Sequence, residues 1–287
     1  MTNVSSIAVI GAGTMGGGIA LTAATSGIKA FQIDISPKQL ERAKAYHAKT
    51  LARSVEKQRM TQAEADEATG RINYTSDMAE AKDADWAIEA ATENMDLKKK
   101  IFAQMLSTFG DNVVLATNTS SISITALAAS VGEAADRVIG MHFFNPVPVL
   151  KLVEVIKGLA TSEETTQRTL QLVQAMGKTP VPANDRPGFI SNRILMPMIN
   201  EAFYAWMEGV AEPEHIDEIM KLGMAHPMGP LRLADLIGLD VCHDIMKVLY
   251  EGLGQDKYFP CPLLRQLVAA GRLGNKSGQG VYDYAKS

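Results

Sequence analysis

The sequence has 287 residues, which is long enough for two domains with cores of their own. Hydrophobic residues make up 46% and charged residues 21%, as in an ordinary globular protein, and a net charge of -4 gives no reason to expect nucleic acid as a partner. Its apolar runs fall far short of the ~20 residues that cross a bilayer, and it begins without a cleavable apolar segment. We therefore expect a cytoplasmic protein, or a mature organellar one, with no membrane partner. Cys242 and Cys261 form no CxxC or clustered pattern, so neither a metal site nor a disulfide framework is expected.

A glycine-rich segment follows the first apolar run, residues 7–10, and precedes a helix-like stretch. It reads Gly11, Ala12, Gly13, Thr14, Met15 and Gly16, the GxGxxG spacing of a dinucleotide-binding loop. The first glycine permits a tight turn, the second lets the backbone approach a pyrophosphate, and the third lets the helix pack on the strand. A second predicted strand, residues 30–33, ends at Asp34, where a carboxylate accepts hydrogen bonds from ribose hydroxyls and repels a 2′-phosphate. The pattern predicts NAD binding and disfavours NADP.

Ser36-Pro37 predicts a capped helix start, and the helix should extend to about Gln58 with many basic side chains. Thr50, Arg53 and Lys57 share one face of it, at spacings of three and four. This face is either an ordinary solvated basic surface or a landing surface for a phosphorylated substrate tail. His47 is interpreted as a residue of the helix surface.

Three further strands are predicted at residues 71–75, 85–91 and 112–116, after a capping box that begins at Thr61. Ligands of an open parallel sheet lie beyond the carboxyl ends of its strands, so the loops at Glu93 and Ser120 are placed to touch a cofactor or substrate. The Ser/Thr/Asn-rich loop at Ser120 is equally well explained as a helix cap, with Ser121 or Ser123 capping the helix that follows. Spacing does not separate the two interpretations.

His142 ends another apolar run, and residues 150–156 alternate with the period of a strand. Glu154 lies among aliphatic neighbours on that strand, so it needs a partner to remain ionised. If the segment 145–148 reverses the chain about Pro148, His142 and Glu154 lie opposite each other. Such a pair suits a general base, but it also describes a core histidine satisfied by a neighbouring acid.

After a helix at 162–176 and an edge strand at 179–182, the helical period takes over. We predict an α/β fold, with an NAD-binding Rossmann-like domain of mostly parallel sheet at residues 1–184 and an all-helical substrate and dimerisation domain at 185–287. Its first helix is apolar nearly all round and should be buried between domains or subunits. Asn192 in that helix is either a satisfied core amide or a ligand contact. The segments predicted for this domain are helices near 188–208, 213–222, 231–253 and 262–270, then a strand at 281–284.

With these motifs in order, the chain from about Ile7 to Tyr284 resembles the L-3-hydroxyacyl-CoA dehydrogenases, especially the bacterial 3-hydroxybutyryl-CoA dehydrogenases. The segments that carry the resemblance are Val9–Gly18 with Asp34, Asn118–Ser121, His142–Pro146, Lys151–Glu154, Pro187–Phe189 with Asn192-Arg193, His226–Pro230 and Lys276–Gly280. The resemblance implies an NAD-dependent oxidoreductase that interconverts (S)-3-hydroxyacyl-CoA and 3-oxoacyl-CoA, on short chains such as C4. It also implies a homodimer.

The resemblance further implies a role for each matching residue. His142 is expected to act as the general base and Glu154 to orient it, while Ser120 and Asn192 hold the reacting oxygen and the thioester end. The expected NAD contacts, besides the glycine loop and Asp34, are Glu93, Lys98, Ser120, Asn145 and Lys276, and the expected coenzyme A contacts are Thr50 and Lys57. Two alternatives remain: a related 3-hydroxy acid dehydrogenase whose substrate lacks coenzyme A, and a non-catalytic NAD-binding structural protein.

Overall fold

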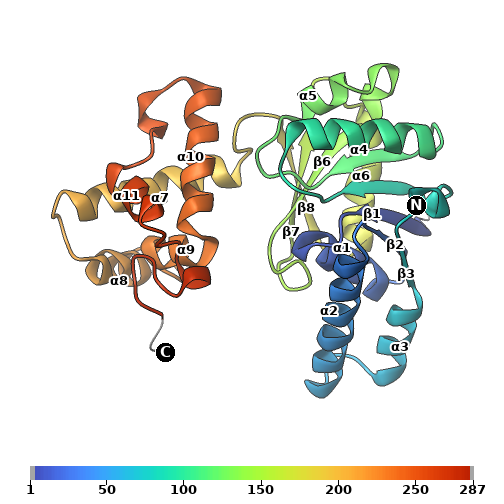
Figure 1. Ribbon diagram of the computed structural model, residues 1–287, viewed down its shortest axis with the longest axis horizontal. Coiled ribbons are helices and arrows are strands. Elements are labelled where there is room, and N and C mark those ends of the chain that lie inside the picture. The colour runs from blue at the N-terminus through green and yellow to red at the C-terminus, as the bar shows by residue number, and fades with distance from the viewer. Residues whose placement is uncertain (1–3, 285–287) are drawn as a thin grey trace. The chain divides into compact units, whose positions relative to one another are not determined.

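The computed structural model describes residues 4–284 and divides into two compact units, Met1–Arg186 and Pro187–Ser287 (Figure 1). Within the described residues, the first unit holds one eight-stranded sheet in the order β3-β2-β1-β4-β5-β6-β7-β8, which is parallel except between β6 and β7. The predicted Rossmann-like α/β unit followed by a helical unit is confirmed. The strands are β1 Ser6–Ile10, β2 Lys29–Ile33, β3 Ile72–Thr75, β4 Trp86–Glu89, β5 Val114–Thr117, β6 Val138–Phe143, β7 Leu152–Lys157 and β8 Thr179–Asn184.

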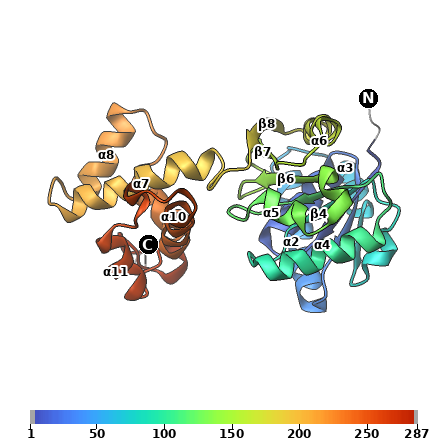
Figure 2. The same cartoon turned by 90° about the horizontal axis from the view of Figure 1, so that it is seen from above.

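Helices cover both faces of this sheet. Apolar side chains of α1 and α6 share one cluster with every second residue of the central strands, while α4 and α5 contact β4, β5 and β6 from the other side. Figure 2 shows α6 and α4 on opposite sides of these strands. The helices of this unit are α1 Thr14–Thr25, α2 Pro37–Glu56, α3 Gln62–Gly70, α4 Met95–Thr108, α5 Ile124–Ala129 and α6 Glu163–Ala175.

The strand register collects the polar residues on the face that α4 and α5 cover. Glu89 is the partner of Thr117 in the parallel pair β4–β5, and Thr117 is the partner of Gly140 in β5–β6. His142 lies two residues beyond Gly140, so its side chain points to the same face, and it pairs with Glu154 of β7. The opposite face is apolar, so polar chemistry at the strand ends is confined to one side of the sheet.

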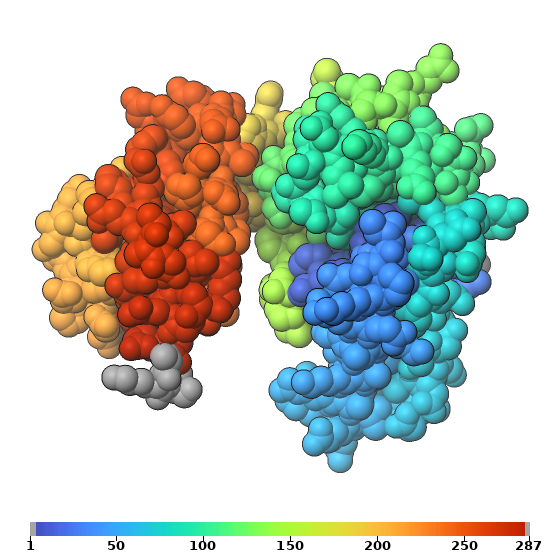
Figure 3. Space-filling view, in the orientation of Figure 1, coloured from blue at the N-terminus to red at the C-terminus, as the bar shows by residue number. Residues whose placement is uncertain are grey.

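The α2–α3 pair projects from the unit, and much of its surface is open on the side shown in Figure 3. The predicted capping box is present, because Thr61 accepts from the Glu64 amide while the Glu64 carboxylate accepts from the Thr61 amide. The predicted Ser36 cap is wrong in its mechanism. Ser36 precedes α2, but its side chain makes no capping hydrogen bond; its amide instead donates to Asp34.

His47 is not a surface residue as predicted, since only 2% of it is exposed. Its Nε2 lies 2.8 Å from the Gly17 carbonyl oxygen, which can only accept, and its Nδ1 lies 2.7 Å from the Tyr74 hydroxyl. In the neutral imidazole, Nε2 therefore donates to Gly17 and Nδ1 accepts from the Tyr74 hydroxyl. Burial lowers the pKa of His47 below its ordinary value, against an opposing contribution from the Gly17 hydrogen bond. The side chain thus ties α2 to α1 and β3.

This arrangement predicts an acid-sensitive contribution to stability. With the folded-state pKa below the ordinary value of 6.5, the unfolded chain binds the proton more readily. The stabilisation is complete above pH 6.5 and is lost as the pH falls toward the folded-state pKa, by at most about 1.4 kcal/mol per pH unit. We expect His47→Gln to flatten the dependence of Tm on pH between about 7.5 and 5.5, measured by calorimetry. The exposed His215→Gln is the control, and equal slopes for His47→Gln and wild type would contradict the prediction.

The second unit is helical, with bounds that correct two predictions. The first helix begins at Ser191 rather than Gly188, because Gly188 and Phe189 have φ of 77° and 49°, outside the helical region. The segment predicted as one helix at 231–253 is two, separated at Gly238, whose φ is 107°. The helices are α7 Ser191–Met207, α8 Pro213–Gly223, α9 Pro230–Ile237, α10 Leu239–Leu253 and α11 Pro262–Ala269.

The strand predicted at 281–284 is also absent from the described residues, where this segment makes only one isolated bridge. Buried Asp235 organises it instead, since its carboxylate accepts from the amides of Val281 and Tyr282 and from the Tyr284 hydroxyl. The alternation of aromatic residues is therefore explained by these hydrogen bonds to Asp235 and not by a sheet. No helix among residues 4–284 is both long enough and apolar enough to span a membrane.

Candidate active site

The glycine loop joins β1 to α1 with a geometry that requires two of its glycines. Gly11 has φ of 108°, and a Cβ there would lie 2.6 Å from the Ala90 carbonyl oxygen. A Cβ on Gly16 would overlap the Gly11 carbonyl. Gly13, by contrast, precedes the helix with open space where a Cβ would stand, and no side chain caps the N-terminus of α1. The uncapped amides and the open approach fit a dinucleotide pyrophosphate.

Asp34 lies at the carboxyl end of β2, against this loop. Its Oδ2 accepts from the Ala12 amide at 2.8 Å and its Oδ1 accepts from the Ser36 amide at 2.8 Å. These backbone bonds hold the carboxylate at the edge of the loop, where a ribose diol can reach it and where a 2′-phosphate would meet like charge.

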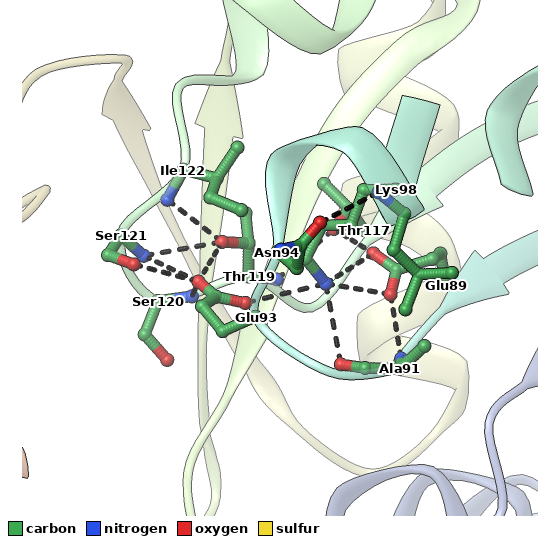
Figure 4. Close-up of polar contacts among 11 residues, drawn as sticks. Glu89, Ala91, Glu93, Asn94, Lys98, Thr117, Thr119, Ser120, Ser121 and Ile122 are labelled. Carbon is green, nitrogen blue, oxygen red and sulfur yellow. Dashed lines mark hydrogen bonds and ion pairs between the residues drawn. The ribbon is translucent and has the colours of Figure 1, made fainter. Parts of the chain in front are cut away.

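Glu93 and Ser120, from the loops after β4 and β5, are brought together. Glu93 Oε1 accepts from the amides of Ser120 and Ser121, both at 3.1 Å, and from the Ser121 and Thr119 hydroxyls. The alternative that Ser121 caps the next helix is wrong: Ser123 does so, accepting from Ala126. The Ser/Thr-rich loop therefore folds around one carboxylate, as Figure 4 shows.

Lys98 lies behind Glu93 and is 1% exposed. Its Nζ lies 2.7 Å from both carboxylate oxygens of Glu89 and 3.4 Å from Glu93 Oε2 (Figure 4). Burial raises the pKa of Glu93, but the Lys98 charge and the hydrogen bonds from residues 119–121 outweigh it and hold the pKa below its ordinary value. Glu93 is thus a fixed carboxylate at the carboxyl edge of the sheet.

His142 and Glu154 face each other across the antiparallel pair β6–β7, as the reversal about Pro148 predicts. The distance from His142 Nδ1 to Glu154 Oε2 is 2.7 Å, and both side chains are buried. A carboxylate accepts only, so Nδ1 carries the proton and Nε2 is the basic nitrogen. The Asn118 side chain accepts from the Phe143 amide at 2.9 Å, which joins the end of this strand to the loop that carries Ser120.

The remaining predicted site residues lie in other elements of the two units. Asn145 is exposed in the turn after β6. In the second unit, Asn192 is buried in the first turn of α7, and Lys276 pairs with Asp240 at 2.6 Å. Thr50, Arg53 and Lys57 lie at the C-terminal end of α2, where Arg53 and Lys57 are exposed and Thr50 is half-buried.

Comparison with known proteins decides the family. Residues 6–186 match the 3-hydroxyacyl-CoA dehydrogenase NAD binding domain, and residues 188–284 match the C-terminal domain of the same family. The chain belongs to the 3-hydroxyacyl-CoA dehydrogenase family. It is an enzyme, an NAD-dependent oxidoreductase.

Named relatives agree with this assignment over their full length. A probable 3-hydroxybutyryl-CoA dehydrogenase from Bacillus subtilis is 54% identical over 98% of both chains. A 3-hydroxybutyryl-CoA dehydrogenase from Bradyrhizobium diazoefficiens is 46% identical over 98% of this chain and 96% of its own. The crystal structure of (S)-3-hydroxybutyryl-CoA dehydrogenase from Ralstonia eutropha has a TM-score of 0.96 at 50% identity, covering 98% of this chain and 99% of its own.

Sequence reasoning overlooked Glu89 and Asn118 in this dehydrogenase. Glu89 lies within the strand predicted at residues 85–91, where a carboxylate in an otherwise apolar run signals a buried partner. Its partner Lys98 lies nine residues further along the chain, on the helix that returns over the sheet. Asn118 belongs to one of the segments that carry the resemblance, but no role is predicted for it, because its contact with Phe143 depends on the pairing of β5 with β6.

Proposed function

We propose that this dehydrogenase interconverts (S)-3-hydroxyacyl-CoA and 3-oxoacyl-CoA, with short chains such as 3-hydroxybutyryl-CoA and acetoacetyl-CoA as substrates. The observation that carries the proposal is the buried hydrogen bond between His142 and Glu154 at the carboxyl end of the sheet. The substrate class is supported by the relatives from Bacillus subtilis and Ralstonia eutropha, whose names specify 3-hydroxybutyryl-CoA.

His142 acts as the general base in the oxidation direction. Its Nε2 takes the proton of the 3-hydroxyl, and Glu154 stabilises the imidazolium that forms and keeps the ring in one orientation. NAD, when bound, supplies the acceptor for the hydride that leaves C3. Ser120 and Asn192 hold the reacting oxygen and the thioester end of the substrate. In the reverse direction the His142 imidazolium returns the proton to the developing alkoxide.

The two parts of the chain have different binding roles. Residues 1–184 bind NAD through the glycine loop, Asp34 and the Glu93 loop, with Lys98 behind Glu93 and with contacts from Asn145. Residues 185–287 contribute Asn192 to the substrate and Lys276 to the cofactor. The exposed face with Thr50, Arg53 and Lys57 binds the phosphates of coenzyme A, because charge-assisted hydrogen bonds from Arg and Lys are strong phosphate contacts.

The second unit also forms the interface of a homodimer in the cytoplasm. Several large apolar side chains on or next to its helices are exposed, more than a solvated surface requires. They include Ile194, Ile219, Leu222, Met224 and Leu236, with exposed fractions of 67%, 61%, 77%, 61% and 56%. Light scattering after gel filtration should give twice the chain mass of 30.9 kDa.

The function is tested by following NADH absorbance with acetoacetyl-CoA, with free acetoacetate, and with NADPH in place of NADH. We expect rapid oxidation of NADH with the thioester alone. Turnover of free acetoacetate without turnover of its thioester would overturn the substrate class and keep the His–Glu chemistry. Turnover of neither, with NADH still bound in a titration, would refute both proposed substrates.

Dependence on coenzyme A is tested separately at α2. Lys57→Ala should raise KM for acetoacetyl-CoA about tenfold, equivalent to ~1.4 kcal/mol, with kcat at saturation nearly unchanged, because the phosphate contact is equal in ground and transition states. Lys44→Ala removes a lysine from the opposite side of the same helix and should leave KM unaltered. Equal KM values for all three proteins would exclude this face as the coenzyme A site.

A further inference from the structure

Glu89 is a buried carboxylate with no assigned role in the reaction. It ends β4 and is 0% exposed. Its oxygens accept from Lys98 Nζ, from the Ala91 amide at 2.7 Å and from the Thr117 hydroxyl at 2.6 Å. A buried charge is costly without such partners, and this one has three from separate segments of the chain.

Lys98 connects Glu89 to the surface of the site. Figure 4 shows its ammonium between the two carboxylates. Both oxygens of Glu89 lie 2.7 Å from Lys98 Nζ, and the nearer oxygen of Glu93 lies 3.4 Å from it. Two negative groups therefore share one positive group, and the buried one holds it more closely. Glu93 keeps its other oxygen for the loop 119–121, and its side chain is 40% exposed, so it faces the site.

The position of this cluster in the sheet indicates which part of the cofactor lies near it. The strand order reverses at β1, which lies between β2 and β4, and dinucleotides lie across this switch point with the pyrophosphate at α1. Asp34 at the end of β2 is on the adenosine side. The loops after β4 and β5, with Glu93 and Ser120, are therefore on the nicotinamide side.

We propose that Glu89 is a positioning residue: through Lys98 it holds Glu93, and through Glu93 the loop that carries Ser120, in the geometry that binds the nicotinamide end of the cofactor and the substrate oxygen. The physical basis of this role is that the Lys98 ammonium pairs with both carboxylates at once, those of Glu89 and Glu93. Without the Glu89 charge, Lys98 pairs with Glu93 alone and draws its carboxylate away from the amides of the loop. The part that concerns the substrate oxygen rests on the proposed function; the part that concerns the cofactor does not.

The test is a double-mutant cycle on Glu89→Gln and Glu93→Gln. Glutamine keeps the shape of Glu89 and removes its charge. We expect Glu89→Gln to weaken NADH binding, measured by fluorescence titration, and to lower kcat/KM for acetoacetyl-CoA about 10–100-fold, the loss seen when the hydrogen-bond partner that orients a metal ligand is removed. Because Glu89 acts through Glu93, adding Glu89→Gln to Glu93→Gln should cost less than twofold more.

If Glu89 has only a structural role, the fold losses in NADH affinity and kcat/KM caused by Glu89→Gln and by Glu93→Gln will multiply in the double variant. That outcome overturns the proposal. Thr169→Val is the stability control: it removes another buried hydrogen bond, in α6, and should lower Tm without changing NADH affinity. If Glu89→Gln fails to fold, Glu89→Gln with Lys98→Met leaves no unpaired buried charge and should fold with the same kinetic defect.

The two proposals fail in separate ways. An inactive wild type that binds NADH would refute the proposed reaction, while the titrations would still measure the effect of Glu89 on cofactor affinity. An active wild type with unchanged NADH affinity and kcat/KM in Glu89→Gln would refute only the role of Glu89.

Discussion

His142→Asn should lower kcat for acetoacetyl-CoA reduction by about 10²–10⁴-fold, the range that a positioned general acid or base contributes. Asparagine fills the space near Phe144 and can hydrogen-bond to Glu154, but it cannot take or give a proton at neutral pH. KM and NADH affinity should change little, because the lost interaction belongs to proton transfer in the transition state. Steady-state kinetics with a titration of NADH binding would measure both.

The matched control for His142 is His215→Asn, on the exposed face of α8, which should leave kcat unchanged. Glu154→Gln adds a second comparison: it keeps a hydrogen-bonding partner for the ring and removes the charge that stabilises the imidazolium. A kcat within tenfold of wild type in His142→Asn would show that another group moves the proton, and the His–Glu pair would then be a satisfied core contact.

Gly16→Ala should destabilise the nucleotide-binding unit more than a glycine-to-alanine substitution at any other position of the loop. The added Cβ would overlap the Gly11 carbonyl, which is backbone and cannot rotate away, and α1 would have to move off β1. Overpacking of this kind costs about 3 kcal/mol at its upper range, equivalent to a fall in Tm of roughly 6–12 °C. Calorimetry of the apoprotein would measure it.

Gly13→Ala is the contrasting variant within the same motif. Gly13 has φ of -73° and open space at its Cβ, so alanine should leave Tm within a degree or two of wild type. It should nevertheless weaken NADH binding, because the methyl group occupies the approach of the pyrophosphate. Equal Tm values for Gly16→Ala and wild type would contradict the close packing of α1 on β1.

Predictions from local pattern succeeded where the deciding interactions are themselves local. The capping box at Thr61 joins residues three apart, and the glycine loop is read from one continuous segment. The pairing of His142 with Glu154 was also accessible, because a hairpin turned about Pro148 sets its own register. A period of two then places both side chains on one face.

Predictions failed where a distant segment decided the outcome. His47 has the neighbours of a surface helix residue, but β3 and α1 cover it, and Tyr74 and Gly17 accept it as a partner. Gly238 has the same local periodicity around it as a continuous helix, yet its φ of 107° ends one helix and begins another.

The sequence by itself therefore determined the class of fold, the NAD-binding loop, the order of the elements and the opposition of His142 to Glu154. Periodicity, turns and glycine spacing are short-range, and they act before tertiary contacts form. Only the tertiary structure decided that Glu89 and Lys98 form a buried pair behind Glu93, and that Asn118 joins two strands at the site. Buried polar groups must find partners wherever the folded chain supplies them, so their choice depends on strand order and helix packing, which no short segment encodes.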